Sequence, residues 1–198
     1  MLFEEEQGRI LLQIARTSIS RALHVACPVV SAVDENLPWL RQPGATFVTL
    51  TQRGDLRGCI GSLQACDPLI EDVSSNAISA ALRDRRFTPL TSDELDTVDL
   101  EVSLLSELQP LEFASEADVL AQLSPGIDGV VFEYGHYRST FLPQVWESLV
   151  RPQQFLAKLK SKAGLSDEFW ADDIKLSRYT VSKWRETDFS GKKEYING

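Results

Sequence analysis

Residues 46–61 predict a β-hairpin, which limits the chain to folds that contain paired antiparallel strands. Thr46 to Thr51 alternates apolar and polar side chains, and Gln52-Arg53-Gly54-Asp55 carries the residues of a tight turn. The run Leu56-Arg57-Gly58-Cys59-Ile60-Gly61-Ser62 then returns as a second strand. Two strands joined by so short a turn pair antiparallel, so we expect a mainly antiparallel sheet.

The rest of the chain predicts single helices placed between further strands, which is typical of an α+β fold with its sheet flanked by helices. The strand segments are 98–104, 129–134, 139–145 and 174–181, and the middle two form a second hairpin around residues 135–138. The helices are 4–24, one opening at Asp67-Pro68, one opening at Ser115, and one from Pro152 to Gly164. We expect one domain over residues 1–198, with room for two intimate sub-domains and a flexible tail at 188–198.

Charge and composition exclude several classes of function. The net charge of −9 disfavours bulk nucleic-acid binding, because a phosphate backbone requires a basic surface. No apolar run approaches the ~20 residues that span a bilayer, and Met1 to Glu6 does not resemble a signal peptide. Three cysteines without a CxxC spacing indicate a reduced, cytoplasmic setting.

The glycines around Cys59 predict that something approaches the backbone of this strand closely, since glycine buries no side chain and weakens a strand. Strict alternation would place Arg57 and Cys59 on one face, where a guanidinium would stabilise the thiolate. Such a site suits a nucleophile or a groove that holds an anion. The alternative is that Cys59 is a small buried apolar residue and Arg57 faces water.

Several ordered blocks give the chain a resemblance to the AMMECR domain family, whose prokaryotic members are called AmmeMemoRadiSam system protein A. The first block is the run Leu56 to Gly61, and together the blocks cover about residues 4–180. The later blocks are 86–90 with Glu94-Leu95, 101–106, 126–130, 140–146, and 155–156 through 162–165.

The resemblance implies an α+β fold with a smaller sub-domain, and a cleft near the glycine-cysteine segment. It also implies a pathway shared with Memo-type and radical S-adenosylmethionine proteins, acting on a small anionic, heterocyclic or nucleobase-like compound. It assigns neither a reaction nor a cofactor, and none is predicted.

Other polar residues are weaker candidates. His136, in the second hairpin turn, could act as a general base only within hydrogen-bond reach of Cys59. Arg86 belongs to an arginine run that either binds an anion or complements a helix dipole. Gln144 is the best polar candidate of its block, and Gly58, Gly61 and Ser62 would line the cleft. With only two histidines and no HxH spacing, we expect no metal site.

Two hypotheses remain open. In the first, the protein is an enzyme or enzyme component that uses Cys59, activated by Arg57, on a small substrate. In the second, it is a non-catalytic binding or scaffold protein, Cys59 is a packing residue, and the glycines shape a groove. The sequence pairs no acid or base with Cys59 and does not decide between them.

Overall fold

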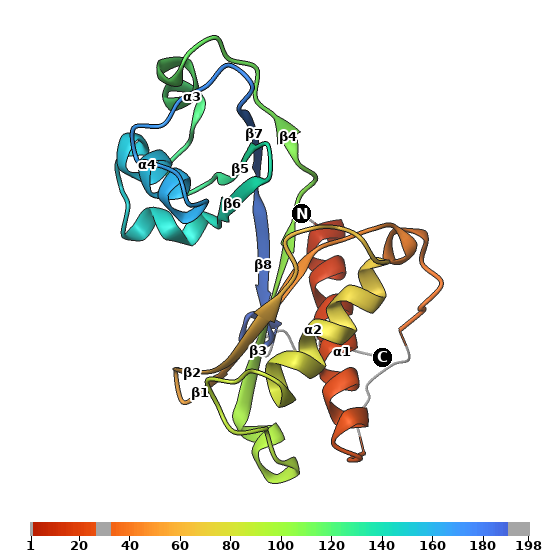
Figure 1. The fold of residues 1–198 in the computed structure, drawn as a ribbon. Coiled ribbons are helices and arrows are strands. Elements are labelled where there is room, and N and C mark those ends of the chain that lie inside the picture. The colour runs from red at the N-terminus through yellow and green to blue at the C-terminus, as the bar shows by residue number, and fades with distance from the viewer. Residues whose placement is uncertain (1, 27–32, 190–198) are drawn as a thin grey trace. The chain divides into compact units, whose positions relative to one another are not determined.

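The computed structural model describes residues 2–26 and 33–189, and it divides into two compact units. The first unit contains residues 1–105 and 182–198, and the second is the continuous segment 106–181. Each has its own antiparallel sheet and helices (Figure 1), which confirms the predicted α+β class. Cys27 and residues 190–198, the greater part of the predicted tail, lie outside the described residues.

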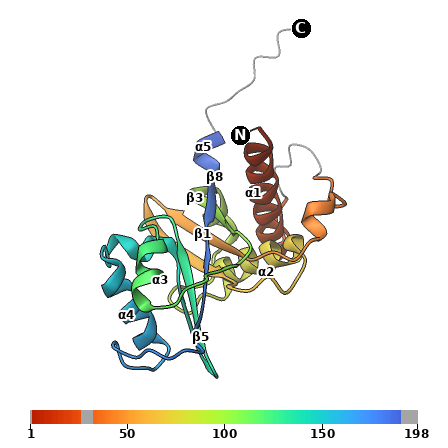
Figure 2. The ribbon, with the colours of Figure 1, turned by 90° about the horizontal axis from the view of Figure 1, so that it is seen from above.

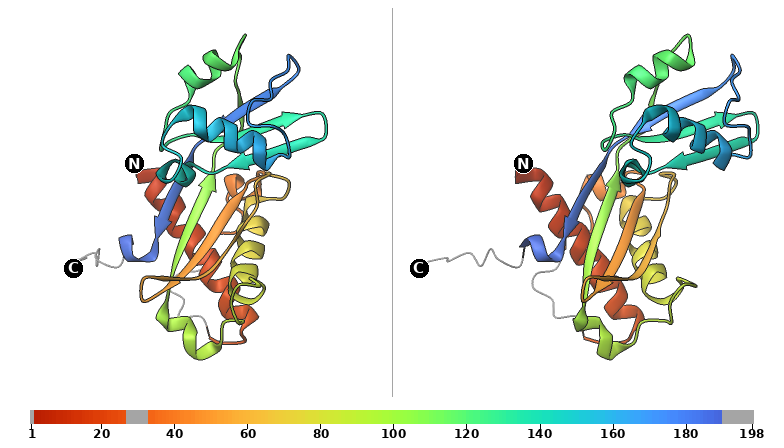
Figure 3. Two further views of the ribbon diagram at one scale, coloured as in Figure 1. Left: turned by 60° about the vertical axis from the view of Figure 1, so that its left-hand side comes forward. Right: turned by 90° about the vertical axis from the view of Figure 1, so that its left-hand side faces the viewer.

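The sheet of the first unit has the strand order β2-β1-β3-β8. The strands are β1 (Thr46–Gln52), β2 (Asp55–Gly61), β3 (Val98–Leu105) and β8 (Val181–Arg185). Figure 3 shows β8 beside β3 from two directions. The predicted first hairpin is confirmed: Gln52 pairs with Asp55, and Arg53 and Gly54 fill the turn with φ of 54° and 89°. Positive φ at both positions matches the right-handed twist of the flanking strands.

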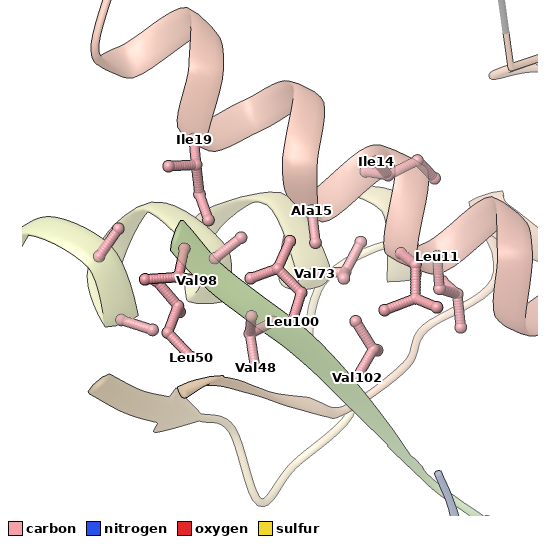
Figure 4. Packing of buried hydrophobic residues seen from close by; sticks show 14 of the residues in the cluster. Leu11, Ile14, Ala15, Ile19, Val48, Leu50, Val73, Val98, Leu100 and Val102 are labelled. Carbon is pink, nitrogen blue, oxygen red and sulfur yellow. The ribbon is translucent and has the colours of Figure 1, made fainter. Parts of the chain in front are cut away.

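Helices α1 (Leu2–Ala22) and α2 (Leu69–Leu82) cover one face of this sheet. Leu11, Ala15 and Ile19 lie one or two turns apart on α1 and meet Val48 and Leu100 of the sheet (Figure 4). The apolar stripe of α1 and the even-numbered residues of β1 and β3 therefore build one core. The short helix α5 (Glu186–Phe189) follows β8 and contains Asp188, where the flexible tail was predicted to begin.

The N-terminus of α2 differs from the prediction by one position. We expected Asp67 to cap the helix and Pro68 to be its first residue, but Pro68 is the N-cap and no side chain caps the helix. The main chain supplies substitutes, because the Leu69 N–H donates to the Gln42 carbonyl and the Gly44 N–H donates to Asp67. Tertiary pairing of this entry loop replaces the local cap.

The second unit has a sheet of order β4-β7-β5-β6 and two α-helices. Its strands are β4 (Gln109–Pro110), β5 (Gly129–Tyr134), β6 (Tyr137–Phe141) and β7 (Lys175–Tyr179), and its α-helices are α3 (Glu116–Gln122) and α4 (Pro152–Lys162). Figure 2 shows α3 and α4 on the same side of β5. Val119, Phe132 and Phe155 are fully buried in a core that these helices share with the sheet.

Two predicted strands end differently in the structure. The segment 174–181 is two strands, β7 and β8, which belong to sheets of different units. The segment 139–145 is strand only as far as Phe141, because Pro143 opens a 3-10 helix (Pro143–Glu147). Proline lacks the N–H that a strand ladder needs, and its fixed φ suits the first turn of a helix.

Candidate functional site

Arg57 occupies a break in the register of β2. Leu50 pairs with Gly58 and Thr51 pairs with Leu56, so Arg57 is an extra residue without a partner on β1. The strict alternation that predicted a shared face for Arg57 and Cys59 is therefore interrupted at Arg57 itself.

The guanidinium of Arg57 is bound within the first unit. It donates to both carboxylate oxygens of Glu94, at 3.1 to 3.4 Å, and to the Thr88 carbonyl oxygen at 2.9 Å. Hydrogen bonds from Thr91 and from Arg57 lower the pKa of Glu94. These contacts give Arg57 a structural partner in place of the predicted pairing with the thiol.

The two glycines leave room for the protein's own atoms. A Cβ on Gly58 would overlap the main-chain oxygen of Ala80 in α2, and a Cβ on Gly61 would overlap the ring of Phe47 and the carbonyl of Thr46. The predicted close approach to this strand therefore exists, and what approaches is helix α2 on one side and a neighbouring ring on the other. Gly58 lets an edge strand lie against a helix backbone, which needs no ligand.

Ser62 joins a buried polar network that ties the end of β2 to α2. The Ser62 hydroxyl donates to Asp72, and the Asp72 carboxylate also accepts from the Thr46 N–H at 2.7 Å and its hydroxyl at 2.6 Å. Asn76 donates to Ser62 at 3.1 Å and to Asp72 at 3.0 Å. Because each member has a partner, this network satisfies buried groups at the start of the hairpin, and Ser62 serves the fold there.

Asp84 and Arg86, just after α2, hold the main chain of Cys59. The Cys59 N–H donates to Asp84 Oδ2 at 3.0 Å, and Arg86 Nη2 donates to the Cys59 carbonyl at 3.0 Å. Since β2 is an edge strand and Cys59 lies opposite Thr49 of β1, these side chains take the place of a missing neighbouring strand.

The two clamping side chains also bind each other. Asp84 accepts from Arg86 Nη2 at 2.7 Å, from Nε at 3.0 Å and from the Arg86 main-chain N–H at 3.1 Å. Arg86 is the main reason that the pKa of the Asp84 carboxyl lies far below its usual range, and burial opposes this shift only in part. With four hydrogen bonds, the carboxylate has no oxygen left to accept a proton from a substrate.

The thiol of Cys59 is half-buried and lies on the face of the sheet opposite the helices. Thr49 Oγ1 donates to Cys59 Sγ at 3.3 Å. The pKa of Arg86 is raised, mainly by Asp84, and the Cys59 side chain adds a smaller contribution of the same sign. Arg86, whose Nη2 binds the Cys59 carbonyl, brings its guanidinium to the residue that carries this thiol. Thr49 and Asp84 were not among the predicted site residues, and only the acidic interruption of the arginine run at 83–86 signalled Asp84.

Arg86 combines a fixed position with an exposed outer edge. Its side chain is 56% exposed, and in the described part of the chain its Nη1 makes no hydrogen bond. Because Nε and Nη2 are held by Asp84 and the Cys59 carbonyl, the orientation of the guanidinium is fixed, and with it the position of Nη1. A guanidinium fixed in this way can receive one oxygen of a carboxylate or phosphate.

The remaining predicted site residues, His136 and Gln144, belong to the second unit. His136 is exposed in the two-residue turn between β5 and β6, with its ring centroid 4.1 Å from that of Tyr137. Gln144 is exposed in the 3-10 helix that follows β6. Their roles stay predictions. Among the residues the structure describes, no three His, Cys, Asp or Glu side chains are grouped to hold a metal ion.

Comparison with known proteins places the chain among relatives of the same length. The AMMECR1 family model matches residues 12–184. A protein from Methanothermobacter thermautotrophicus is 37% identical over 91% of this chain and 95% of its own length. One from Methanocaldococcus jannaschii is 33% identical over 94% of each chain.

A solved structure has the same fold. The crystal structure of an uncharacterised protein from Pyrococcus horikoshii aligns with a TM-score of 0.73 and 31% identity, over 91% of this chain and 92% of that one. In the described part of this chain, no helix is long and apolar enough to cross a membrane. The chain belongs to the AMMECR1 family.

Proposed function

We propose that this protein binds a small anionic compound at Cys59 and Arg86, as a non-catalytic component of its pathway. The observation that carries the proposal is Arg86, which Asp84 and the Cys59 carbonyl hold in place while its Nη1 keeps no hydrogen bond among the described residues. A carboxylate or phosphate oxygen on Nη1 would place the rest of the ligand over Cys59 and Thr49.

Binding fits this geometry better than catalysis does. The Asp84 carboxylate is saturated with hydrogen bonds, so it supplies no base that could activate the thiol. Arg57, the predicted activator, is bound to Glu94.

A second candidate function keeps Cys59 as a nucleophile. One observation favours it: the Thr49 hydroxyl and the Arg86 guanidinium are both donors next to the sulfur, and donors stabilise a thiolate. That thiolate would attack an electrophilic carbon of a compound held by Arg86 and form an S–C bond, while the bond from that carbon to its leaving group breaks and the leaving group departs with the electron pair.

Alkylation with two reagents of different charge tests the binding proposal. In a Cys27→Ser background, Cys59 and the exposed Cys66 react with iodoacetate or with its neutral analogue iodoacetamide, as each thiolate displaces iodide. We expect the ratio of the iodoacetate rate to the iodoacetamide rate to be about fivefold higher at Cys59 than at Cys66. That factor corresponds to an ion pair of about 1 kcal/mol at an exposed site.

Matched arginine variants identify the group responsible. Arg86→Gln should lower the ratio at Cys59 to that of Cys66, whereas Arg85→Gln, the exposed neighbour, should leave it unchanged. Equal ratios at the two cysteines in the unmodified protein contradict the proposal. An iodoacetamide rate at Cys59 more than about tenfold that at Cys66 would instead favour the nucleophile.

We also place this binding step in a reduced, cytoplasmic pathway shared with Memo-type and radical S-adenosylmethionine proteins. Cys59 and Cys66 are both free thiols, which supports a reducing compartment. Titrating the fluorescently labelled protein with a purified Memo-type protein tests the partnership. A second titration uses a purified radical S-adenosylmethionine protein. Saturable binding is expected, and its absence with both partner proteins contradicts the partnership.

A further inference from the structure

A cavity of about 230 Å³ in the second unit is separate from the residues that the proposed function uses. It is lined by Ser106, Gln109, Asp128, Arg178, Tyr179 and Thr180. This volume is several times the roughly 30 Å³ that a water molecule occupies, and it is below the range of drug-sized pockets. The cavity therefore suits a ligand of only a few heavy atoms.

Asp128 is the most unusual residue of the cavity, because it is almost fully buried and only one of its two carboxylate oxygens accepts a hydrogen bond. The residue is 3% exposed. Its Oδ2 accepts from the Ser124 N–H at 2.8 Å, while Oδ1 has no hydrogen bond among the described residues. No side-chain polar atom in that part of the chain is both sealed off and without a partner, so Oδ1 opens onto the cavity.

The position of this carboxylate is fixed by its own main chain. The Asp128 N–H donates to the Ser124 carbonyl at 3.0 Å, and the buried Trp146 indole donates to the Asp128 carbonyl at 2.7 Å. Held from three sides, Asp128 has an acceptor aimed into the cavity before any ligand arrives. Preorganised acceptors of this kind bind a cationic donor without having to reorder.

Arg178 brings the opposite charge to the same cavity. Its Nη1 donates to the Gln122 carbonyl at 3.3 Å, and its remaining guanidinium nitrogens make no other hydrogen bond in the described chain. Arg178 and Asp128 do not form an ion pair, although both line the cavity. A carboxylate and a guanidinium that face one space without touching leave a gap for a molecule with both charges.

We propose that this cavity binds the ammonium and carboxylate groups of a small α-amino acid. The ammonium group donates to Asp128 Oδ1, and the carboxylate accepts from Arg178. Tyr179, the neighbour of Arg178 on β7, also lines the cavity. The size of the cavity restricts the ligand to a short side chain.

Titration of the full chain with three probes tests the proposal. Glycine carries both charges, whereas methylammonium and acetate carry one each, and the amide signals of Asp128 and Gly129 in ¹H–¹⁵N spectra report binding. We expect saturable shifts with glycine, and an affinity at least about tenfold tighter than for either single-charge probe. A hydrogen bond to a charged group contributes on this scale.

Variants separate the two charges. Asp128→Asn keeps an acceptor for the Ser124 N–H and should weaken glycine binding about tenfold, and Arg178→Gln should do the same. Lys175→Gln, an exposed change on the same strand, is the matched control and should bind glycine normally.

Three results would overturn the assignment. If the affinity for glycine is no higher than that for acetate, the role of Asp128 is contradicted. If Arg178→Gln binds glycine with unchanged affinity, the role of Arg178 is contradicted. Acetamide serves as a fourth, neutral probe, and tighter binding of acetamide than of glycine would identify a neutral amide as the ligand. The near-UV circular dichroism of each variant must match that of the parent protein, so that loss of binding is not loss of fold. None of these outcomes depends on Cys59.

Discussion

Individual residues of β2 pack against or bind other residues of the first unit. Because Gly58 has no side chain, the strand can lie against the Ala80 carbonyl. Arg57 binds the segment after α2 through hydrogen bonds to Glu94 and to the Thr88 carbonyl. What stays available to a ligand is the Cys59 thiol and the outer edge of Arg86. Most residues of the motif therefore serve packing, and the proposed ligand contacts are limited to Cys59 and Arg86.

Gly58→Ala tests that interpretation. The added methyl group overlaps a main-chain oxygen that cannot rotate away, so we expect the free energy of unfolding to fall by about 2 kcal/mol or more. Urea unfolding measures the loss. Leu56→Ala, a 44%-exposed position on the same strand, is the control and should change it by less than about 0.5 kcal/mol.

The same variant separates packing from ligand contact. At temperatures where Gly58→Ala is folded, the ratio of iodoacetate to iodoacetamide rates at Cys59 should equal that of the parent protein. Full stability together with a changed ratio would mean that Gly58 borders the ligand instead.

Asp84→Asn should destabilise the protein in a pH-dependent way. Because the folded-state pKa of Asp84 lies below its unfolded value near 3.9, its contribution is fully present above about pH 4 and is lost as the pH falls. We expect a deficit of about 2 kcal/mol at pH 7, typical of charge-assisted hydrogen bonds to a buried group. At pH 3 the loss in the free energy of unfolding should be smaller than at pH 7.

Urea unfolding at the two pH values measures this difference. Asp99→Asn, on the exposed face of β3, serves as control and should change the free energy of unfolding by less than about 0.5 kcal/mol at pH 7. A deficit for Asp84→Asn that is the same at pH 7 and pH 3 would show that its charge contributes nothing.

At the scale of elements, local signals located most helices and strands. Ser115 caps α3 as predicted, since its hydroxyl accepts from the Asp118 N–H at 3.2 Å. Gly164 ends α4 with φ of 93°, and the Leu165 N–H donates to the Lys160 carbonyl, as expected for a Schellman motif. These features depend on residues within a few positions of one another, so the sequence alone shows them.

Elements whose limits depend on distant partners were not predictable in the same way. Only the positions of the two sheets divide 174–181 into β7 and β8. The site behaved similarly: Cys59 and Arg86 were chosen from the sequence, but the clamp by Asp84 needs α2 to end beside β2. The register break at Arg57 left no local sign, and the ion pair between Arg57 and Glu94 was not predicted either.

Gly164→Ala should weaken α4 and its unit. A non-glycine residue at this positive φ costs about 1 kcal/mol, which thermal unfolding of the variant would measure. Gly164→Asn should lower the stability less than Gly164→Ala does, because asparagine tolerates the left-handed region better than alanine. Equal losses for the two variants would contradict a conformational cause.

At the scale of the whole molecule, the second unit is one continuous segment with its own sheet and core. The first unit is not continuous, because β8 returns after the second unit to complete its sheet. Trp184 of β8 packs over Gly8, and Glu186 of α5 forms an ion pair with Arg16. The C-terminal strand is therefore part of the first unit's core.

A fragment of residues 106–181 should fold alone, whereas residues 1–105 should not unfold cooperatively without β8. Chains of this size can bury enough surface to be stable, but an incomplete sheet exposes its core. Urea titration followed by circular dichroism compares the two fragments. A fragment 106–181 without a cooperative transition would contradict the independence of its core.

The pairing at the ends of the second unit also has a consequence for chain entropy. The Ser106 N–H donates to the Thr180 carbonyl at 2.9 Å, so the chain leaves and returns at neighbouring points. Once residues 106–181 are folded, they join β3 to β8 as a tight turn would. Closing the same connection as a random coil would cost ~3 kcal/mol more, at about 0.6 kcal/mol for each doubling of loop length. Folding of the inserted segment thus lowers the entropic cost of adding the last strand to the first sheet.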